Sequence, residues 1–384
     1  MRTYKNLFEY AITDECMDRA FQNAIKSKKD RADVKEVIKN KAAVKEKIRK
    51  DFIEGNLPIY MHVACLKYDG ASKKQRTIVK PFFTTDAPEQ WMQHIIVEAI
   101  RDVLTKGMYF HSCGSVPKKG VHSGKRYLAK YLKRSGNKAR YCLKIDLRKF
   151  YKNVNTDILK HKFQRIVKDE KMLSLIFWVI DNNKAQFPNG EIVEGGLTIG
   201  GYPSQYFANF YLQDFDHYIK EILRVPFYMR YMDDMVFLSN NKQELHKLRL
   251  LVENYFKPQK ISLKPNYQVF RLCYKTWAGK EKGRFIDFMG FKFFKSKTTI
   301  RKSIFFNACR AVSQIVKRIS RGKRLNHNDA SKIMSYKGWF DSTDTHYAYA
   351  CVISNRIDMA LCKKIISAES KRRNYEYNLQ TNVK

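Results

Sequence analysis

Residues Phe227–Leu238 read FYMRYMDDMVFL, in which two short apolar runs flank the acidic pair Asp233 and Asp234. Such runs predict two β-strands joined by a tight turn, which would carry both carboxylates at its tip. Adjacent carboxylates beside residues that should be buried repel each other, and a divalent cation relieves that repulsion. A bare Asp-Asp pair is more often an ordinary polar turn. The apolar runs on both sides, and Tyr231 before the pair, favour a metal-binding site.

A third carboxylate stands at the end of an earlier predicted strand. Tyr141–Leu147 alternates apolar with other residues and carries Asp146 near its exit. In a two-metal displacement the ions lie roughly 3.5–4 Å apart and need carboxylates that converge from different strands. Mg²⁺ needs few protein ligands, because water and substrate phosphates complete its coordination. We therefore predict two Mg²⁺ ions, replaceable by Mn²⁺, and a catalytic triad of Asp146, Asp233 and Asp234.

The charge of the chain indicates an acidic polymer as its partner. Its 74 Lys and Arg against 37 Asp and Glu give a formal net charge of +37, for which nucleic acid is the natural counter-ion. Residues 117–140 contain nine basic residues and no acid, and residues 301–328 contain eight and none. One such run often only keeps a helix soluble, but two separated runs favour a long basic groove. A membrane is the weaker alternative, because the best apolar run, Met172–Ile180, is too short to span one.

The cysteines and histidines indicate neither disulfides nor structural zinc. The eight cysteines are scattered without a CxxC pair, and the nine histidines show no ligand spacing. No secretory leader is recognisable at the Met1 end. We expect a protein of the reducing cytoplasm.

The spacing of apolar residues divides the chain into helical and strand-like parts. The first stretch is helical, and Tyr60–Leu66 with Thr77–Phe83 then reads as a hairpin. Helical spacing returns at Pro88–Leu104, and Asn155 is suited to cap a further helix. From about Lys297 the chain is helical and basic. The pattern predicts an α+β protein.

Four blocks resemble those of reverse transcriptases, in the same order and at similar spacing. Tyr231–Asp234 resembles the family's YxDD box, and Leu143–Val154 (LKIDLRKFYKNV) resembles the block of the first aspartate. Asp287–Phe294 (DFMGFKFF) is similar to the primer-grip block. Ser335–Asp341 (SYKGWFD) is similar to a thumb sequence of group II intron and related prokaryotic enzymes. The resemblance extends over about residues 60–347.

One segment makes the resemblance specific to a subfamily of reverse transcriptases. Most prokaryotic relatives read QGxxxSP where this chain reads IGGYPSQ at residues 199–205. Ile in place of the first Gln, and Gln in place of Pro, resemble the reverse transcriptases of diversity-generating retroelements. Phe110–Pro117 (FHSCGSVP) and Leu263–Phe270 (LKPNYQVF) are similar to that subfamily too, whereas residues 118–120 (KKG) depart from its usual Gly-Arg-Gly.

The resemblance implies a right-hand polymerase fold with fingers, an antiparallel-sheet palm and a helical thumb. It implies N-terminal helices and fingers over residues 1–140 and a thumb over 297–384. The palm would span 141–296, with a fingers-side helical excursion over about 160–195.

The resemblance also implies roles for individual residues. Lys74 and Arg76 would hold the incoming triphosphate, and Tyr151 would exclude the ribose 2′-hydroxyl. Their alternatives are a solvated surface charge for either basic residue and a core aromatic for Tyr151. Lys264 would protonate pyrophosphate or is a plain surface lysine. The resemblance places four residues in the substrate site: Ile199, Gly200, Ser204 and Gln205. It implies a primer grip of Met289, Gly290 and Phe291, and the backbone of Leu147 as a metal ligand.

The function implied is an RNA-directed DNA polymerase that copies a template RNA into adenine-mutagenised cDNA for a diversity-generating retroelement. Template RNA, a DNA or RNA primer and dNTPs would be its partners, together with a small basic helical accessory protein. The setting would be the cytoplasm of a bacterial, archaeal or phage-infected cell. The alternatives are the enzyme of a retron, group II intron or phage-defence system, and a non-catalytic RNA-binding relative.

Overall fold

The computed structural model describes residues 3–68, 75–193 and 195–382, so that Lys74 lies outside the described residues. The chain forms two compact units, which we call unit 1 and unit 2. Unit 1 comprises Met1–Pro117, Ile145–Met235 and Arg249–Tyr267, and unit 2 comprises Lys118–Lys144, Val236–Leu248 and Gln268–Lys384.

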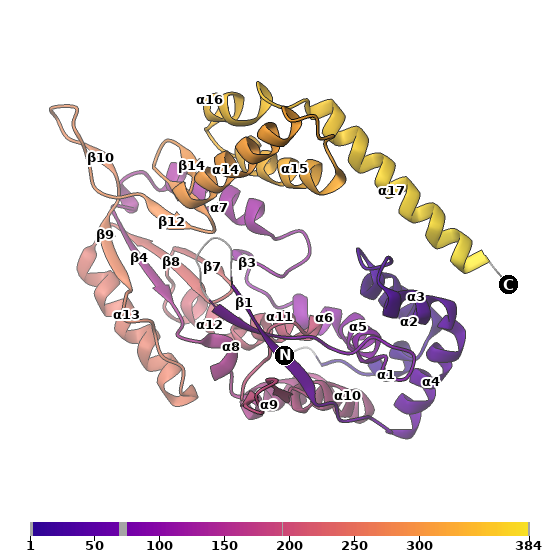
Figure 1. Ribbon diagram of the computed structural model, residues 1–384. Helices are drawn as coiled ribbons and strands as arrows, with labels where there is room; N and C mark the ends of the chain where they lie inside the picture. The colour runs from indigo at the N-terminus through magenta and orange to yellow at the C-terminus, as the bar shows by residue number, and fades with distance from the viewer. Residues whose placement is uncertain (1–2, 69–74, 194, 383–384) are drawn as a thin grey trace. The chain divides into compact units, whose positions relative to one another are not determined.

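Unit 1 begins with a group of packed helices (Figure 1). Trp91 and Phe21 join two of them, with ring centroids 4.5 Å apart, and the Trp91 indole donates a 2.9 Å hydrogen bond to the Met17 carbonyl. The Thr13 side chain caps its helix by accepting from the Cys16 amide. The helices are α1 (Leu7–Ala11), α2 (Asp14–Ile25), α3 (Ala32–Lys39), α4 (Lys41–Glu54), α5 (Glu89–Ala99) and α6 (Arg101–Thr105).

A four-stranded sheet of order β2-β1-β5-β6 lies in the same unit. The hairpin predicted around residues 60–83 is confirmed, because β1 (His62–Tyr68) and β2 (Gln75–Val79) pair antiparallel. The residues between the two strands, 69–74, lie outside the described residues. The two short strands are β5 (Ala185–Gln186) and β6 (Ile192–Val193).

Unit 1 contains further helices after residue 149. Asn155 caps α9 as expected, since its side chain accepts from the Asp157 and Ile158 amides. Phe163 of α9 stacks on Phe210, with ring centroids 4.6 Å apart. The elements are α8 (Phe150–Asn153), α9 (Thr156–Ile166), α10 (Glu170–Asp181), α11 (Tyr202–Tyr211), α12 (Gln213–His217), the π-helical turn η2 (Tyr218–Ile222) and, further on, the 3-10 turn η3 (Lys257–Gln259).

A five-stranded sheet carries the acidic hairpin. Its order is β3-β7-β8-β4-β9, so that β7 and β8 are neighbours, as the sequence predicts. The sheet is mixed and not wholly antiparallel, because β3 pairs in parallel with β7, whereas β4 pairs antiparallel with β9. The strands are β3 (Ser112–Cys113), β4 (Tyr141–Asp146), β7 (Phe227–Tyr231), β8 (Asp234–Ser239) and β9 (Gln268–Arg271). The predicted α+β class is confirmed.

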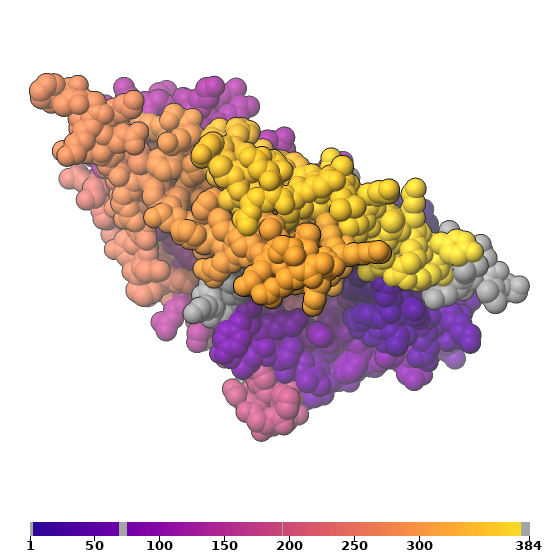
Figure 2. Space-filling view, turned by 45° about the horizontal axis from the view of Figure 1, so that its top comes forward, coloured from indigo at the N-terminus to yellow at the C-terminus, as the bar shows by residue number. Residues whose placement is uncertain are grey.

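Unit 2 contains a helical bundle beside small sheets (Figure 1), and the orange and yellow atoms of its C-terminal segments form a continuous surface in the space-filling view (Figure 2). Its core contains Ala308, Val312 and Ile315 of one helix, which pack with Ile333 and Phe340 of a second helix. The helix that reaches Asn382 extends beyond the others (Figure 1). The elements are α7 (Val121–Ser135), η1 (Gly136–Lys138), β10 (Tyr274–Lys275), β11 (Glu281–Lys282), β12 (Ile286–Phe288), β13 (Phe291–Phe293), β14 (Thr298–Ile300), α14 (Lys302–Ile319), α15 (His327–Asp341), α16 (His346–Tyr349), η4 (Ala350–Ser354) and α17 (Met359–Asn382), while α13 (Lys242–Phe256) runs through the division between the units.

No helix in the described part of the chain is both long enough and apolar enough to cross a membrane.

Candidate active site

The two acidic residues of the hairpin stand where β7 gives way to β8. Met232 and Asp233 form the turn, and Asp234 begins β8. Met232 adopts a left-handed backbone conformation with φ of 54°, which is uncommon for a residue with a side chain. Burial, together with the negative charges of Asp146 and Asp234, raises the pKa of Asp233 to about 6. The three predicted catalytic carboxylates therefore interact electrostatically within unit 1.

Asp146 is fixed by backbone contacts at the end of β4. Its carbonyl accepts a 2.8 Å hydrogen bond from the Lys264 amide, and the next amide, that of Leu147, donates to the Asp233 carbonyl at 3.4 Å. The Lys264 ammonium forms an ion pair with Oδ2 of Asp146. Lys264 thus lies at the triad, although the sequence left open whether it was a plain surface lysine.

Asp146 and Asp233 each carry a feature that a cation could satisfy. Oδ1 of Asp146 is buried and has no hydrogen-bond partner among the described residues, and such an atom needs a proton donor or a cation. Burial first, and the charges of Asp146 and Asp234 second, raise the pKa of Asp233, and a cation beside it would oppose that shift. In the described ranges no group of three or more His, Cys, Asp or Glu side chains is placed so that it could hold a metal ion. Carboxylates that leave coordination positions for water and phosphate suit Mg²⁺, because it rarely occupies an all-protein cage.

Tyr151 lies close to the acidic hairpin. Burial raises the pKa of its hydroxyl above the ordinary range, the charge of Asp233 adds to this, and the charges of Arg76 and Arg230 oppose it. The Tyr151 carbonyl accepts a 2.7 Å hydrogen bond from the Leu197 amide. These contacts bring Tyr151 and Arg76, predicted separately from the sequence, into one electrostatic environment with Asp233.

The segment around residues 199–205 is held against β2. The Ile199 carbonyl accepts a 2.8 Å hydrogen bond from the Val79 amide. Gly200 has φ of 132°, and a Cβ atom there would overlap the Val79 carbonyl. Glycine is therefore required at residue 200 because the backbone of β2 occupies the space that a side chain would need. Ser204 is buried and Gln205 is exposed.

The predicted primer-grip residues form a turn within unit 2. Met289 and Gly290 lie between β12 and β13, with φ of 53° and 86°. A Cβ atom at Gly290 would lie 2.8 Å from the Trp339 ring, and the rings of Phe291 and Trp339 have centroids 4.9 Å apart. The primer-grip block and the thumb block of the sequence are therefore in direct contact.

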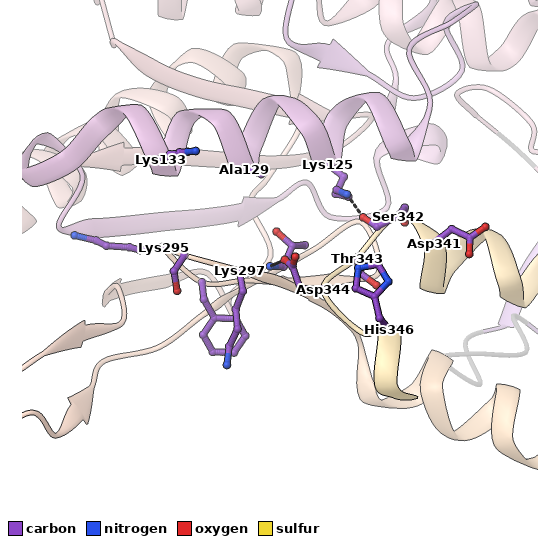
Figure 3. Close-up of a pocket in the computed structure, with 13 residues that line it drawn as sticks. Lys125, Ala129, Lys133, Lys295, Lys297, Asp341, Ser342, Thr343, Asp344 and His346 are labelled. Atoms are coloured by element: carbon purple, nitrogen blue, oxygen red, sulfur yellow. Dashed lines mark hydrogen bonds between the residues drawn. The ribbon is translucent and has the colours of Figure 1, made fainter. Parts of the chain in front are cut away.

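A lysine-lined cavity of about 310 Å³ lies elsewhere in unit 2 (Figure 3). Lys125 and Lys133 reach it from α7, within the acid-free block of residues 117–140. Lys295 and Lys297 line it from the turn before β14. The Lys125 ammonium donates to the Ser342 carbonyl, and burial lowers the Lys125 pKa. The predicted basic run thus contributes to a concave surface together with residues more than 150 positions later in the chain.

A buried polar network beside the turn was missed from the sequence. Arg230, on β7, is fully buried and pairs with Asp216, which is also fully buried. The sequence did contain a signal for this network, namely the charged Arg230 inside an otherwise apolar strand. A charged side chain at such a position needs a buried partner.

Comparison with known proteins identifies one family. The model of the family "Reverse transcriptase (RNA-dependent DNA polymerase)" matches residues 86–293, more than half of the 384 residues. No curated protein matches the sequence.

Solved structures similar to the chain include telomerases. A telomerase from Candida albicans with a TWJ fragment of telomeric RNA aligns with a TM-score of 0.46 and 10% identity, over 87% of this chain and 62% of that one. An apo telomerase from Candida tropicalis aligns with a TM-score of 0.48 and 13% identity, over 77% of this chain and 56% of that one. The chain therefore spans less than two thirds of either protein.

Proposed function

Because the chain belongs to the reverse transcriptase (RNA-dependent DNA polymerase) family, we propose that it copies an RNA template into DNA at Asp146, Asp233 and Asp234. One observation carries the proposal. Carboxylates from two strands lie near enough for the charges of Asp146 and Asp234 to raise the pKa of Asp233. A protein that only bound RNA would have no need of this repulsive arrangement.

Divalent ions are the partners that would offset the repulsion. Asp146, Asp233 and Asp234 would hold two Mg²⁺ or Mn²⁺ ions, with the Leu147 carbonyl as a further ligand. When bound, such ions stabilise the attacking and leaving oxygens of the displacement. The unpartnered Oδ1 of Asp146 supports its part in this set.

The reaction joins the primer 3′-oxygen to the α-phosphorus of a dNTP as the bond to pyrophosphate breaks. Lys264 would donate a proton to the leaving pyrophosphate, and its ion pair with Asp146 supports a place beside the reacting groups. Lys74 and Arg76 would hold the triphosphate. Tyr151 would lie against the sugar and exclude a 2′-hydroxyl, and its interaction with the Asp233 charge supports that position.

The other predicted parts of the enzyme follow the family arrangement. Residues 1–140 would form the N-terminal helices and fingers, 141–296 the palm and 297–384 the thumb. Met289, Gly290 and Phe291 would grip the primer, and their contact with Trp339 of the thumb block supports a shared role. Ile199, Gly200, Ser204 and Gln205 would line the nucleotide site. The lysine-lined cavity offers positive charge for the phosphates of a template–primer duplex.

A more specific proposal rests on the sequence of residues 199–205. Its resemblance to diversity-generating retroelement enzymes favours adenine-mutagenised cDNA as the product and a small basic helical protein as a partner, in the cytoplasm of a bacterial, archaeal or phage-infected cell. A retron, group II intron or phage-defence enzyme is the alternative. The RNA that co-purifies with the protein from its host distinguishes these, because each system has its own template.

Primer extension on poly(rA)–oligo(dT) with Mg²⁺ or Mn²⁺ tests the polymerase activity. The wild-type protein should extend the primer, and the Asp233→Asn variant should not. A wild-type protein that binds the duplex without extending it would support the non-catalytic alternative.

A further inference from the structure

The guanidinium of Arg230 makes four hydrogen bonds inside unit 1. Nε donates to Oδ1 of Asp216 at 2.8 Å, and Nη2 donates to Oδ2 of the same carboxylate at 2.5 Å. Nη1 donates to Oδ1 of Asn209 at 2.9 Å and to the carbonyl of Met232 at 3.0 Å. The forked guanidinium can bind two groups with fixed geometry, which a lysine ammonium cannot do.

The partners of Arg230 are themselves fixed. The Tyr228 hydroxyl donates to Oδ1 of Asp216 at 2.7 Å. The Asn209 amide donates to the Gly114 carbonyl at 2.9 Å. Asp216, Asn209 and Tyr228 are all buried, as is Arg230 itself. The guanidinium therefore has little freedom to leave the Met232 carbonyl.

Met232 is held at both ends of its backbone. Its amide donates to the Cys113 carbonyl at 3.1 Å, and its carbonyl accepts from Arg230. Its sulfur lies 3.4 Å from the Asn209 amide nitrogen, and its side chain contacts Gly114, where a Cβ would lie 3.0 Å from Cγ of Met232. These contacts maintain the left-handed conformation that the turn requires.

The Met232 carbonyl belongs to the peptide group that links Met232 to Asp233. Since that group is planar, fixing the direction of its oxygen also fixes the direction in which the chain enters Asp233. We propose that Arg230 is a positioning residue for the polymerase reaction: anchored by Asp216 and Asn209, it orients the turn so that Asp233 and Asp234 face Asp146. This inference rests on the proposed function, and it assigns Arg230 no contact with substrate or metal.

The competing explanation is that the Arg230–Asp216 pair only stabilises the fold. Buried ion pairs can often be replaced by apolar side chains without loss of stability, whereas removal of one partner leaves an unpaired charge. A replacement of the whole network therefore separates the two roles. The triple variant Arg230→Met, Asp216→Leu, Tyr228→Phe removes both buried charges. It also removes the Tyr228 hydroxyl, which would otherwise lose Asp216 as its hydrogen-bond acceptor.

If Arg230 positions the turn, the triple variant should fold with a Tm close to that of the wild type but have a kcat about 10²-fold lower, the loss expected for a misplacement of about 1 Å. The KM for dNTP and the Kd for template–primer should change little. Mn²⁺ binding, followed by electron paramagnetic resonance without nucleic acid, should weaken at least about tenfold, because the carboxylates no longer converge.

Two further variants complete the experiment. Arg230→Lys retains the charge beside Asp216 but not the fork, so it should fold and still lose kcat and Mn²⁺ affinity. Ile176→Val removes one methylene from the buried face of α10 and should leave both quantities unchanged, as a control for lost stability.

A folded triple variant with wild-type kcat and Mn²⁺ affinity would overturn the inference. If the triple variant does not fold, a folded Arg230→Lys variant with wild-type kcat and wild-type Mn²⁺ affinity would overturn the inference. Failure of the proposed function can be distinguished from failure of this inference. If the wild-type protein has no polymerase activity, its Mn²⁺ binding compared with that of the variants still shows whether Arg230 orients the carboxylates.

Discussion

The ammonium group of Lys264 is ion-paired with Oδ2 of Asp146, while Oδ1 of the same carboxylate has no hydrogen-bond partner in the described part of the chain. The two residues are 118 positions apart in sequence, and the backbone amide of Lys264 also donates to the Asp146 carbonyl at 2.8 Å. The lysine therefore places a positive charge beside the Asp146 carboxylate.

Asp233→Asn should abolish DNA synthesis and stabilise the metal-free protein. The substitution removes a carboxylate whose ionisation is disfavoured by burial and by its acidic neighbours, with a pKa raised to about 6. The expected gain is on the order of 1–3 kcal/mol at neutral pH, measured by urea unfolding with a chelator present. Asp181→Asn, at a largely exposed acid that pairs with Lys160, is the matched control. Synthesis by a folded Asp233→Asn protein would contradict the proposed triad.

Tyr151→Val should admit ribonucleotides, because it removes the ring expected to collide with a 2′-hydroxyl. The ratio of kcat/KM for dTTP to that for UTP, measured on poly(rA), should fall by at least about tenfold, which corresponds to roughly 1.4 kcal/mol of discrimination. Tyr151→Phe keeps the ring and should keep the ratio. An unchanged ratio for the Val variant would make Tyr151 a packing residue only.

Ile199→Gln should lower misincorporation opposite template adenines. A site built around a hydrogen-bonding side chain rejects wrong partners by leaving polar groups unsatisfied, which Ile cannot do. The backbone bond from Val79 to the Ile199 carbonyl does not depend on the side chain, so the local fold should survive. Sequencing cDNA made on one adenine-containing template measures the effect, with Ile199→Val as the apolar control. Equal error rates in active proteins would mean that Ile199 only packs.

His94 should make the protein sensitive to acid. Its ring is buried and stacks on Tyr202, with centroids 3.7 Å apart, and burial together with the charge of Lys28 lowers its pKa to about 3. An unfolded histidine takes up a proton near pH 6.5, so between about pH 6.5 and 3 the unfolded state binds more protons and the folded state loses stability as pH falls. The loss is at most about 1.4 kcal/mol per pH unit from this group.

His94→Gln should remove that component, so that the free energy of unfolding falls less steeply from pH 6.5 to 4.5 than in the wild type. His161→Gln, at an exposed position of α9, serves as the control. Parallel pH profiles for wild type and His94→Gln would show that His94 is protonated in the folded state.

The lysine-lined cavity should contribute to the salt dependence of nucleic-acid binding. Lys133 and Lys297 are exposed at its edge, and replacing both with Gln should reduce the slope of log K against log salt by about 0.9 for each phosphate that is no longer neutralised. Lys247→Gln, an exposed lysine of α13, is the control. A double variant with the wild-type slope would exclude the cavity from the duplex path.

The hairpin and the helices could be predicted because their signals are local. The apolar runs around Asp233, the cap at Asn155 and the stripe of α14 all lie within a few residues of the features they determine. The parallel pairing of β3 could not be predicted, because a strand of two residues has no periodicity.

Contacts between distant segments carry no local signal either. Lys264 reaches Asp146 from 118 residues away, and Asp216 meets Arg230 from another element. The resemblance implied a set of site residues, and the structure adds how the backbone of Val79 restricts Gly200.

The buried Arg230–Asp216 pair also restricts how this sequence can change over evolutionary time. Loss of either member alone leaves an uncompensated buried charge, at a cost of about 3–5 kcal/mol, comparable to much of the stability of a typical domain. A lineage that replaced one residue would pass through a poorly folded intermediate before the second change could rescue it. The two positions are therefore epistatic, and they should be inherited as a unit even where the surface around them diverges.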